Sequence, residues 1–346
     1  MPRCALFALA SLLFITTDVS FADDPNRGTT LQPLRAGMIG LDNSHVPAFT
    51  KIFNASDAGG DVAGIRVVVG YPGGTDYGPS KDRVAKFTQG MRDAGVEIVE
   101  TIPQLLEKCD VVLLESVDGR IHLEEAIPVI LAGKPVFIDK PIAASLVDAI
   151  VIFELAKKHN VPVFSSSSLR FGAEVQSALA SETLGEIVGA ESWGPCDYQA
   201  GTPDLCFYGI HGVETLFTLM GGGCTTVART QTARGDVVVG TWTGDRIGTF
   251  RGIRKGSAGF GAVAFGSKSI APLKTPATYK DLCHQIGRFF RTGKPPVDAA
   301  TTIEIFAFME AADESKRQGG KPVAVADILA KAREEAASKL ATIEAR

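Results

Sequence analysis

The sequence has no excess of charge of either sign and no long run of like charges. Its 346 residues include 35 Lys and Arg against 39 Asp and Glu, which gives a formal net charge of -4 with neutral histidine. A protein that holds a polyanion needs a strongly basic surface. The composition therefore argues against nucleic acid as a partner.

A long apolar run is also missing. A helix that crosses a bilayer needs about 20 apolar residues, and the run from Ala5 to Ile15 is roughly half as long. That run follows Arg3 and precedes Ser20-Phe21-Ala22, an arrangement typical of a secretory signal and its cleavage site. We therefore predict that residues 1–22 are a signal peptide, and that the protein is exported (periplasmic or extracellular) without a stable membrane anchor.

Cysteine is scarce, and removal of residues 1–22 would leave an odd number of thiols. The remaining ones are Cys109, Cys196, Cys206, Cys224 and Cys283. In an oxidising compartment Cys196 and Cys206 are close enough in the sequence to pair across a short loop. Separate buried thiols that act as small apolar residues are an equally consistent interpretation.

The first half contains a regular alternation of short β-branched runs with amphipathic stretches. The predicted strands are Met38–Ile39, Ile65–Val69, Val111–Leu114, Val136–Asp139 and Val163–Phe164. The predicted helices between them are Pro47–Asn54, Lys81–Ala94, Leu123–Ala132 and Leu146–Lys158. This alternation predicts right-handed crossovers and an α/β domain with a Rossmann-like, doubly wound parallel sheet over residues 33–165. Ligands of such sheets bind beyond the carboxyl ends of the strands.

The second half has a different pattern, in which alternating apolar and polar residues are joined by glycine-rich turns. The pattern covers Val188–Trp193, Thr225–Thr232, Val237–Thr243, Ile247–Ile253 and Phe260–Phe265. It predicts an α+β domain with an open, mainly antiparallel sheet over residues 166–330, followed by a C-terminal helix over residues 331–346. Two domains are expected at this length, because single cores rarely grow beyond about 250 to 300 residues.

The turn after the first predicted strand lacks two of the three glycines that a dinucleotide fold places there. It reads Gly40-Leu41-Asp42-Asn43-Ser44-His45. Asp42 stands where the backbone should approach a pyrophosphate, and like charges about 4 Å apart repel by roughly 1 kcal/mol in water. A cap formed by Asn43 or Ser44 explains the segment as well, and it still leaves a helix N-terminus that attracts anions.

The second predicted strand is followed by no carboxylate, although an acid there usually binds the ribose hydroxyls. The sequence at this point is Gly70-Tyr71-Pro72-Gly73-Gly74. Lys81 or Arg83 is placed to meet a 2′-phosphate, although such side chains more often belong to a solvated helix face. The residues alone therefore make a weak case for a dinucleotide.

A longer motif is more specific. The segment Ala132-Gly133-Lys134-Pro135-Val136-Phe137-Ile138-Asp139-Lys140-Pro141-Ile142-Ala143 closely resembles the A-G-K-H/P-V-x-x-E-K-P-x-A segment of the glucose-fructose oxidoreductase, inositol dehydrogenase and rhizopine catabolism family, Gfo/Idh/MocA. His122, Leu184–Ile187 and Gly209–Leu216 occur in the family's order and spacing. The turn with the pattern G-L-D-x-S-H resembles that of an exported branch of this family.

This resemblance implies an NAD- or NADP-dependent oxidoreductase that acts on a CH–OH group of a sugar, a polyol or a derivative, and it implies a homo-oligomer. The predicted cofactor-binding residues follow the strands of the first half. They are Gly40, Asp42, Ser44, His45, Tyr71, Glu115, Ser116 and Lys140.

Oxidation of a hydroxyl requires an acceptor for the proton of the oxygen while a hydride leaves the carbon. Lys140 would hydrogen-bond the reacting oxygen and stabilise its developing negative charge. The resemblance implies that His211, on the predicted helix Gly209–Met220, is the general base or the partner of a substrate hydroxyl. Lys140 and His211 are therefore the predicted catalytic residues.

Three further side chains, Arg170, Asp197 and Tyr198, are predicted to contact the substrate. For Arg170 an interdomain ion pair is an equal alternative, and aromatic side chains such as Tyr198 more often serve packing. The aspartate that is common four residues before the family's histidine is replaced here by Phe207, which would shift its task to Asp197 or Asp204.

No set of residues has the spacing of a metal site. Asp42, His45, Glu115, Asp118 and His122 would all lie at the carboxyl edge of the first sheet. A position at this edge does not by itself define a ligand, so the sequence predicts no metal.

A second interpretation stays open, in which the chain has lost the dinucleotide and binds a carbohydrate or another partner without catalysis. The altered glycine turn favours it, whereas Lys140 and His211 argue against it, because a pure binding protein has no need for that pair. An exported enzyme would also leave free dinucleotide behind. An active form would therefore hold its cofactor tightly, in a redox-neutral cycle.

Overall fold

A computed structural model describes residues 33–276 and 278–345. The predicted signal peptide at residues 1–22 lies outside this part of the chain. No helix among the described residues is both long and apolar enough to span a membrane.

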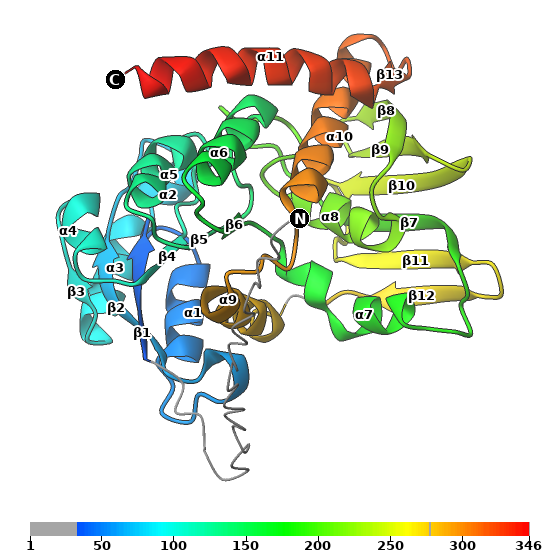
Figure 1. Ribbon diagram of the computed structural model, residues 1–346. Helices are drawn as coiled ribbons and strands as arrows, with labels where there is room; N and C mark the ends of the chain where they lie inside the picture. Colours follow the sequence, from blue (N-terminus) through cyan, green and yellow to red (C-terminus); the bar gives the residue numbers. More distant parts are fainter. Residues whose placement is uncertain (1–32, 277, 346) are drawn as a thin grey trace, which may run out of the picture. The chain divides into compact units, whose positions relative to one another are not determined.

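The first sheet has six parallel strands in the order β3-β2-β1-β4-β5-β6 (Figure 1). The strands are β1 Leu34–Ile39, β2 Ile65–Tyr71, β3 Glu97–Ile98, β4 Val111–Leu114, β5 Val136–Ile138 and β6 Val163–Phe164. This confirms the predicted Rossmann-like sheet. The added strand β3 has two residues, too few to show the alternation from which a strand is predicted.

The elements between these strands are α1 His45–Phe53, η1 Gly60–Val62, α2 Gly78–Lys81, α3 Val84–Asp93, α4 Ile102–Leu106, α5 His122–Leu131 and α6 Leu146–Lys158. Helix α6 begins where the side chain of Ser145 accepts a hydrogen bond from the backbone N–H of Asp148, as a helix cap should. All four residues of β4 are buried, because both faces of the sheet are covered.

The two faces bury different partners. Val112 and Leu114 of β4 belong to one apolar cluster with residues of α5 and α6. Val111 and Leu113 point the opposite way, into a second cluster with residues of α1 and α9 (Lys280–Thr292). Alternate residues of a strand face opposite sides, so four consecutive apolar residues serve both cores.

Helix α9 departs from the predicted domain boundary. It comes late in the chain, yet it packs against η1 and α1 and so completes the first core (Figure 1). The ring of its Phe289 lies 4.7 Å from the ring of Phe164 in β6, edge to face. Residues 33–165 therefore do not form the first domain alone.

The second sheet has seven strands in the order β12-β11-β7-β10-β9-β8-β13. They are β7 Ile187–Pro195, β8 Cys224–Thr232, β9 Gly235–Trp242, β10 Arg246–Ile253, β11 Gly261–Gly266, β12 Ile270–Lys274 and β13 Val323–Ala324. Only β7 and β10 pair in parallel, so the sheet is mainly antiparallel, as predicted.

The remaining elements are η2 Ser168–Phe171, α7 Ala173–Leu179, α8 Gly209–Met220, α10 Ala299–Arg317 and α11 Val325–Glu344. Helices α8 and α10 contact the second sheet, and α11 packs along α6 (Figure 1). The C-terminal helix begins at Val325, a few residues before the predicted boundary. Cys196 and Cys206 are free, buried thiols, which agrees with the interpretation that they act as small apolar residues and do not pair.

The contact between α9 and η1 yields a stability prediction. A Cβ atom added at Gly287 in α9 would lie 2.3 Å from the backbone oxygen of Asp61. A backbone atom cannot give way cheaply, so we expect Gly287→Ala to lower the free energy of unfolding by about 1–3 kcal/mol in urea titrations. Gly90→Ala is the matched control, because a Cβ in that helix meets nothing within 4 Å. That change should leave stability unchanged or raise it by up to about 1 kcal/mol.

Candidate functional site

A cavity of about 440 Å³ lies beyond the carboxyl ends of the first sheet and is closed on its other side by residues of the second half. Its volume falls within the roughly 300–1,000 Å³ of small-molecule sites. The first half contributes Asn43, Ser44, His45, Pro79, Arg83, Val117 and Lys140. The second half contributes Ser168, Leu169, Gln199, Phe207, Tyr208, His211, Phe260 and Tyr279.

Lys140 and His211 line the same cavity although they are 71 positions apart (211 minus 140). Lys140 follows β5 by two residues, and His211 lies in the first turn of α8. Lys140 makes no ion pair with a residue of the described chain, and its positive charge acts on both His211 and Asp139. The cavity is therefore lined by the cationic side chain of Lys140, which follows a strand of the first sheet, and by the imidazole of His211, from a helix that packs on the second sheet.

The imidazole of His211 is held by a chain of hydrogen bonds. Its Nδ1 lies 2.7 Å from the hydroxyl oxygen of Ser167. That hydroxyl accepts the backbone N–H of Leu169 and, in the tautomer that carries its proton on Nδ1, also accepts the Nδ1–H of His211, which leaves Nε2 free to accept a proton. Burial, followed by the charges of Lys140 and His45, lowers the pKa of His211 well below its usual value. The ring is therefore neutral at neutral pH and able to accept a proton.

The glycine turn, in contrast, faces protein atoms. A Cβ at Gly40 would lie 2.1 Å from the hydroxyl oxygen of Ser116, and the residue has a φ of +79°, so glycine is required there by packing. The carboxylate of Asp42 accepts the Ser80 hydroxyl at 2.5 Å and the Val117 backbone N–H at 2.8 Å. Its two oxygens are thus engaged by protein donors.

The other predicted cofactor-binding residues divide in the same way. Ser44 and His45 line the cavity, as Lys140 does. Tyr71 does not, and its backbone oxygen accepts the N–H of Gly40. Ser116 donates its hydroxyl to the buried carboxyl of Glu125 at 2.6 Å. Gly40, Asp42, Tyr71 and Ser116 thus have protein contacts and do not line the cavity, and their role in cofactor binding stays a prediction.

Glu115 is a separate case. It follows β4, is fully buried, and makes no hydrogen bond to a residue of the described chain with either carboxylate oxygen. It does not line the cavity, so it is not placed to contact a cofactor there.

None of the three predicted substrate residues lines the cavity. Arg170 forms an ion pair with Glu214, at 2.8 Å between Nε and Oε1. Both residues belong to the predicted second domain, so this is not the interdomain pair that the sequence left open. The hydroxyl of Tyr198 contacts Asp236 and Arg229 in a buried network that also engages Asp204. Asp197 is exposed.

Several residues that line the cavity were not among the predicted site residues. Tyr279 lies between β12 and α9, and its ring packs edge to face on His45 at 4.6 Å. Phe207 and Tyr208 precede α8, and Arg83 precedes α3. The only signals for these residues were Phe207 as a departure from the family pattern and Arg83 as a possible phosphate ligand. Tyr279 reaches the site because α9 packs on the first half of the chain, and no local sequence pattern predicts that packing.

The fold and the site together define a class: a two-sheet protein with a Rossmann-like first half and a polar cavity where such folds bind ligands. Residues 75–167 match the model of an oxidoreductase family with an NAD-binding Rossmann fold, the Gfo/Idh/MocA family. The matched segment contains the motif Ala132–Ala143, so for this part of the chain the resemblance found in the sequence is confirmed.

A curated relative is an uncharacterised oxidoreductase, YhhX, of Escherichia coli K12. It is 33% identical over 111 residues, which cover 29% of this chain and 32% of that protein. The chain thus matches about a third of the length of this relative, and the match does not carry the activity of a whole protein.

Solved structures share the fold at low identity. A probable dehydrogenase from Thermotoga maritima aligns with a TM-score of 0.71 at 18% identity, over 85% of this chain and 100% of that one. A scyllo-inositol dehydrogenase from Lactobacillus casei, solved with NAD(H) and scyllo-inositol, aligns with a TM-score of 0.69 at 13% identity, over 85% and 100% of the two chains. At such identities the likeness concerns the fold alone.

The residues present fit a dinucleotide only in part. Ser44 at the N-terminus of α1 and the guanidinium-bearing Arg83 both line the cavity, and a helix N-terminus with a nearby cation suits a phosphate. The bonds of Asp42 to Ser80 and Val117 close the glycine turn. Ser44, Arg83 and Lys140 line the cavity and are the residues that would hold a bound dinucleotide there.

The buried carboxyl of Glu125 beside this turn gives a pH prediction. Burial, followed by the charges of Asp42, Glu124 and Asp118, raises its pKa to about 8, whereas the bond from Ser116 opposes this. The folded protein keeps a proton that the unfolded chain releases above about pH 4.5, so this group makes stability fall as the pH rises toward 8. The slope is about 1.4 kcal/mol per pH unit.

We expect Glu125→Gln to flatten the fall in the free energy of unfolding between pH 5.5 and 7.5 by roughly 1.4 kcal/mol per pH unit, because the variant lacks this titrating proton. Urea unfolding at several pH values measures the effect. The amide oxygen still accepts the Ser116 hydroxyl, so the variant should fold. An unchanged slope in the variant would show that Glu125 is ionised in the folded protein.

Proposed function

We propose that this protein is an NAD- or NADP-dependent oxidoreductase that acts on a carbon–oxygen bond of a sugar, a polyol or a derivative of one. The observation that carries the proposal is the meeting of Lys140 and His211 in one cavity beyond the carboxyl ends of the first sheet. The match of residues 75–167 to an NAD-binding oxidoreductase family supports it.

The chemistry assigns a task to each residue. The nicotinamide, when bound, accepts or donates the hydride of the reacting carbon. The neutral imidazole of His211 accepts the proton of the substrate hydroxyl, and the ammonium of Lys140 stabilises the negative charge that develops on that oxygen. In the reverse direction His211 returns the proton. Ser167 fixes the ring, and Glu214, bound by Ser166, Ser167 and Arg170, fixes the segment that carries Ser167.

The cavity wall suits a polyhydroxylated molecule. It offers the polar side chains of Asn43, Ser168 and Gln199 together with the aromatic rings of Tyr208 and Phe260. Sugars and polyols present hydroxyl groups and apolar ring faces, which such walls bind together.

A homo-oligomer remains part of the proposal. The registers of the second sheet place Val239, Ile247, Phe265 and Ile270 on one face. Ile247 is 55% exposed and Ile270 is 63% exposed. Exposed apolar residues that share a face are typical of subunit interfaces, and a second copy of the chain would cover them. Export rests on the sequence of residues 1–22, and an exported enzyme would keep its cofactor through a redox-neutral cycle.

A second function is favoured by one observation, the closed glycine turn at Asp42. In that case the chain binds a carbohydrate or another partner through the same cavity and performs no redox chemistry. The two functions separate on denaturation of the protein purified from its native compartment. Released dinucleotide, identified by absorbance and mass, would support the enzyme. A blank, together with no binding of added NAD or NADP in calorimetry, would support the binding protein.

For the enzyme, we expect Lys140→Ala to reduce turnover to background while substrate affinity stays within about tenfold, roughly 1.4 kcal/mol. The assay follows nicotinamide absorbance with inositols and hexoses as substrates. Lys134→Ala is the matched control: Lys134 belongs to the same motif but binds the backbone oxygen of Cys109, away from the cavity. Turnover in Lys140→Ala equal to that of the control would remove Lys140 from the mechanism.

A further inference from the structure

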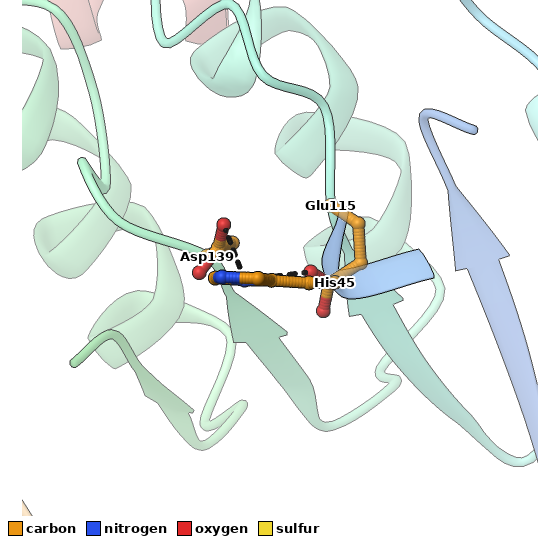
Figure 2. Close-up of side chains that lie close together, drawn as sticks. All are labelled: His45, Glu115 and Asp139. Atoms are coloured by element: carbon orange, nitrogen blue, oxygen red, sulfur yellow. Dashed lines mark ion pairs between the residues drawn. The ribbon is translucent and has the colours of Figure 1, made fainter. Parts of the chain in front are cut away.

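Three buried polar side chains lie close together (Figure 2), and one of them, His45, also lines the cavity. His45 begins α1 after strand β1, Glu115 follows β4, and Asp139 follows β5. These strands are neighbours in the first sheet, so their carboxyl ends meet at one edge. One ligand-type atom from each residue lies within 4.8 Å of the others.

The polar atoms of this cluster are not satisfied by the protein. Glu115 is 0% exposed, and both its carboxylate oxygens lack a hydrogen-bond partner among the described residues, as do Oδ1 of Asp139 and Nδ1 of His45. The Nδ1 of His45 lies 3.0 Å from Oδ2 of Asp139 and 3.8 Å from Oε2 of Glu115, without the alignment of a hydrogen bond. Unpartnered buried polar groups are rare and costly, and these four face one another.

A contact within the protein does not resolve the cluster. Whether ionised or protonated, the Glu115 carboxyl needs a hydrogen-bond partner, yet neither of its oxygens has one within the described chain. An ion pair of His45 with Asp139 alone would leave Glu115 unexplained.

Asn43 links the three residues of the cluster. Its side-chain amide donates to Oδ2 of Asp139 at 3.0 Å and to the backbone oxygen of Glu115 at 2.7 Å. Its oxygen accepts the backbone N–H of His45 at 2.6 Å. The bond to Asp139 is of the kind that orients a ligand in a metal site, and the other two fix the backbone that carries Glu115 and His45.

We propose that His45, Glu115 and Asp139 bind a divalent transition-metal cation, and that Zn²⁺ is the ion they fit best. Zn²⁺ accepts both imidazole nitrogen and carboxylate oxygen as ligands, and a set of three protein ligands leaves one position open, as in catalytic zinc sites. His45 lines the cavity, so the cation would lie at its floor and act as a Lewis acid on a bound oxygen.

The proposal goes beyond the oxidoreductase function and does not depend on it. It also departs from the sequence, which predicted no metal. The structure includes Asp139, which sequence reasoning did not consider as a ligand. It excludes Asp42, Asp118 and His122, whose side chains are engaged by Ser80, by Arg120 and by backbone oxygens.

The test uses the full chain, purified without a histidine tag, and measures metal per chain by mass spectrometry. Metal-free protein, prepared with a chelator, is then titrated with Zn²⁺ in competition with a fluorescent chelator, and with Co²⁺ by visible absorption. We expect one equivalent of metal, a Co²⁺ spectrum typical of low coordination number, and a higher melting temperature with Zn²⁺.

Glu115→Gln and Asp139→Asn should each weaken Zn²⁺ binding by more than about 100-fold, since the loss of an outer partner alone costs roughly 10–100-fold. Glu125→Gln is the control, because it replaces another buried carboxyl near the turn without touching the cluster. It should bind as the original protein does. Circular dichroism of the metal-free proteins checks that each variant folds, and either of the two ligand variants suffices for the comparison.

The proposal is overturned if the original protein binds less than stoichiometric Zn²⁺ and Co²⁺ and shows no change in melting temperature. It is equally overturned if a folded ligand variant binds Zn²⁺ as tightly as Glu125→Gln does. Neither result depends on enzymatic turnover. A protein that binds Zn²⁺ but not dinucleotide would separate the metal site from the proposed oxidoreductase function.

Discussion

The structure depends on one constraint: polar groups buried at the carboxyl edge of a parallel sheet must each find a partner. Strands β1, β4 and β5 end side by side and bring Asp42, Glu115 and Asp139 into a region that water does not reach. Asp42 finds its partners in Ser80 and Val117, and Asn43 ties the three strand ends together. The carboxylate of Glu115 has no hydrogen-bond partner among the described residues, which is rare for a buried acid.

The way these groups are satisfied also decides where a ligand can enter. Ser80 of α2 donates a hydrogen bond to Asp42 in the glycine turn, where this fold usually binds a phosphate. The surface that is open to a ligand is instead lined by Ser44, Arg83 and Lys140. A likeness in fold to dinucleotide-binding proteins therefore does not extend to every contact, and the site must be argued from its own side chains.

The sequence predicted the architecture well because its signals are local. The buried run Val111–Leu114 and the alternation in β7 to β11 specify strands, and helix α8 was predicted with the bounds it has. Only some of the site residues carry local sequence signals. Lys140 and His211, which were predicted through motifs, line the cavity, whereas Arg170 and Tyr198 bind Glu214 and Asp236, partners that are distant in sequence. The cluster of His45, Glu115 and Asp139 could not be predicted, since hydrogen-bond satisfaction is a property of the folded chain.

Helix α9 has a consequence for how the molecule assembles. Phe289 and its neighbours cover the face of the first sheet that carries Phe137 and Phe164, and Tyr279, just before the helix, packs on His45. A nascent chain that has emerged only as far as β12 presents this aromatic face to solvent and lacks Tyr279 in the cavity wall. Folding of the first half therefore waits for the last quarter of the chain, which makes long-range closure a late and slow event and gives holding chaperones an apolar face to bind.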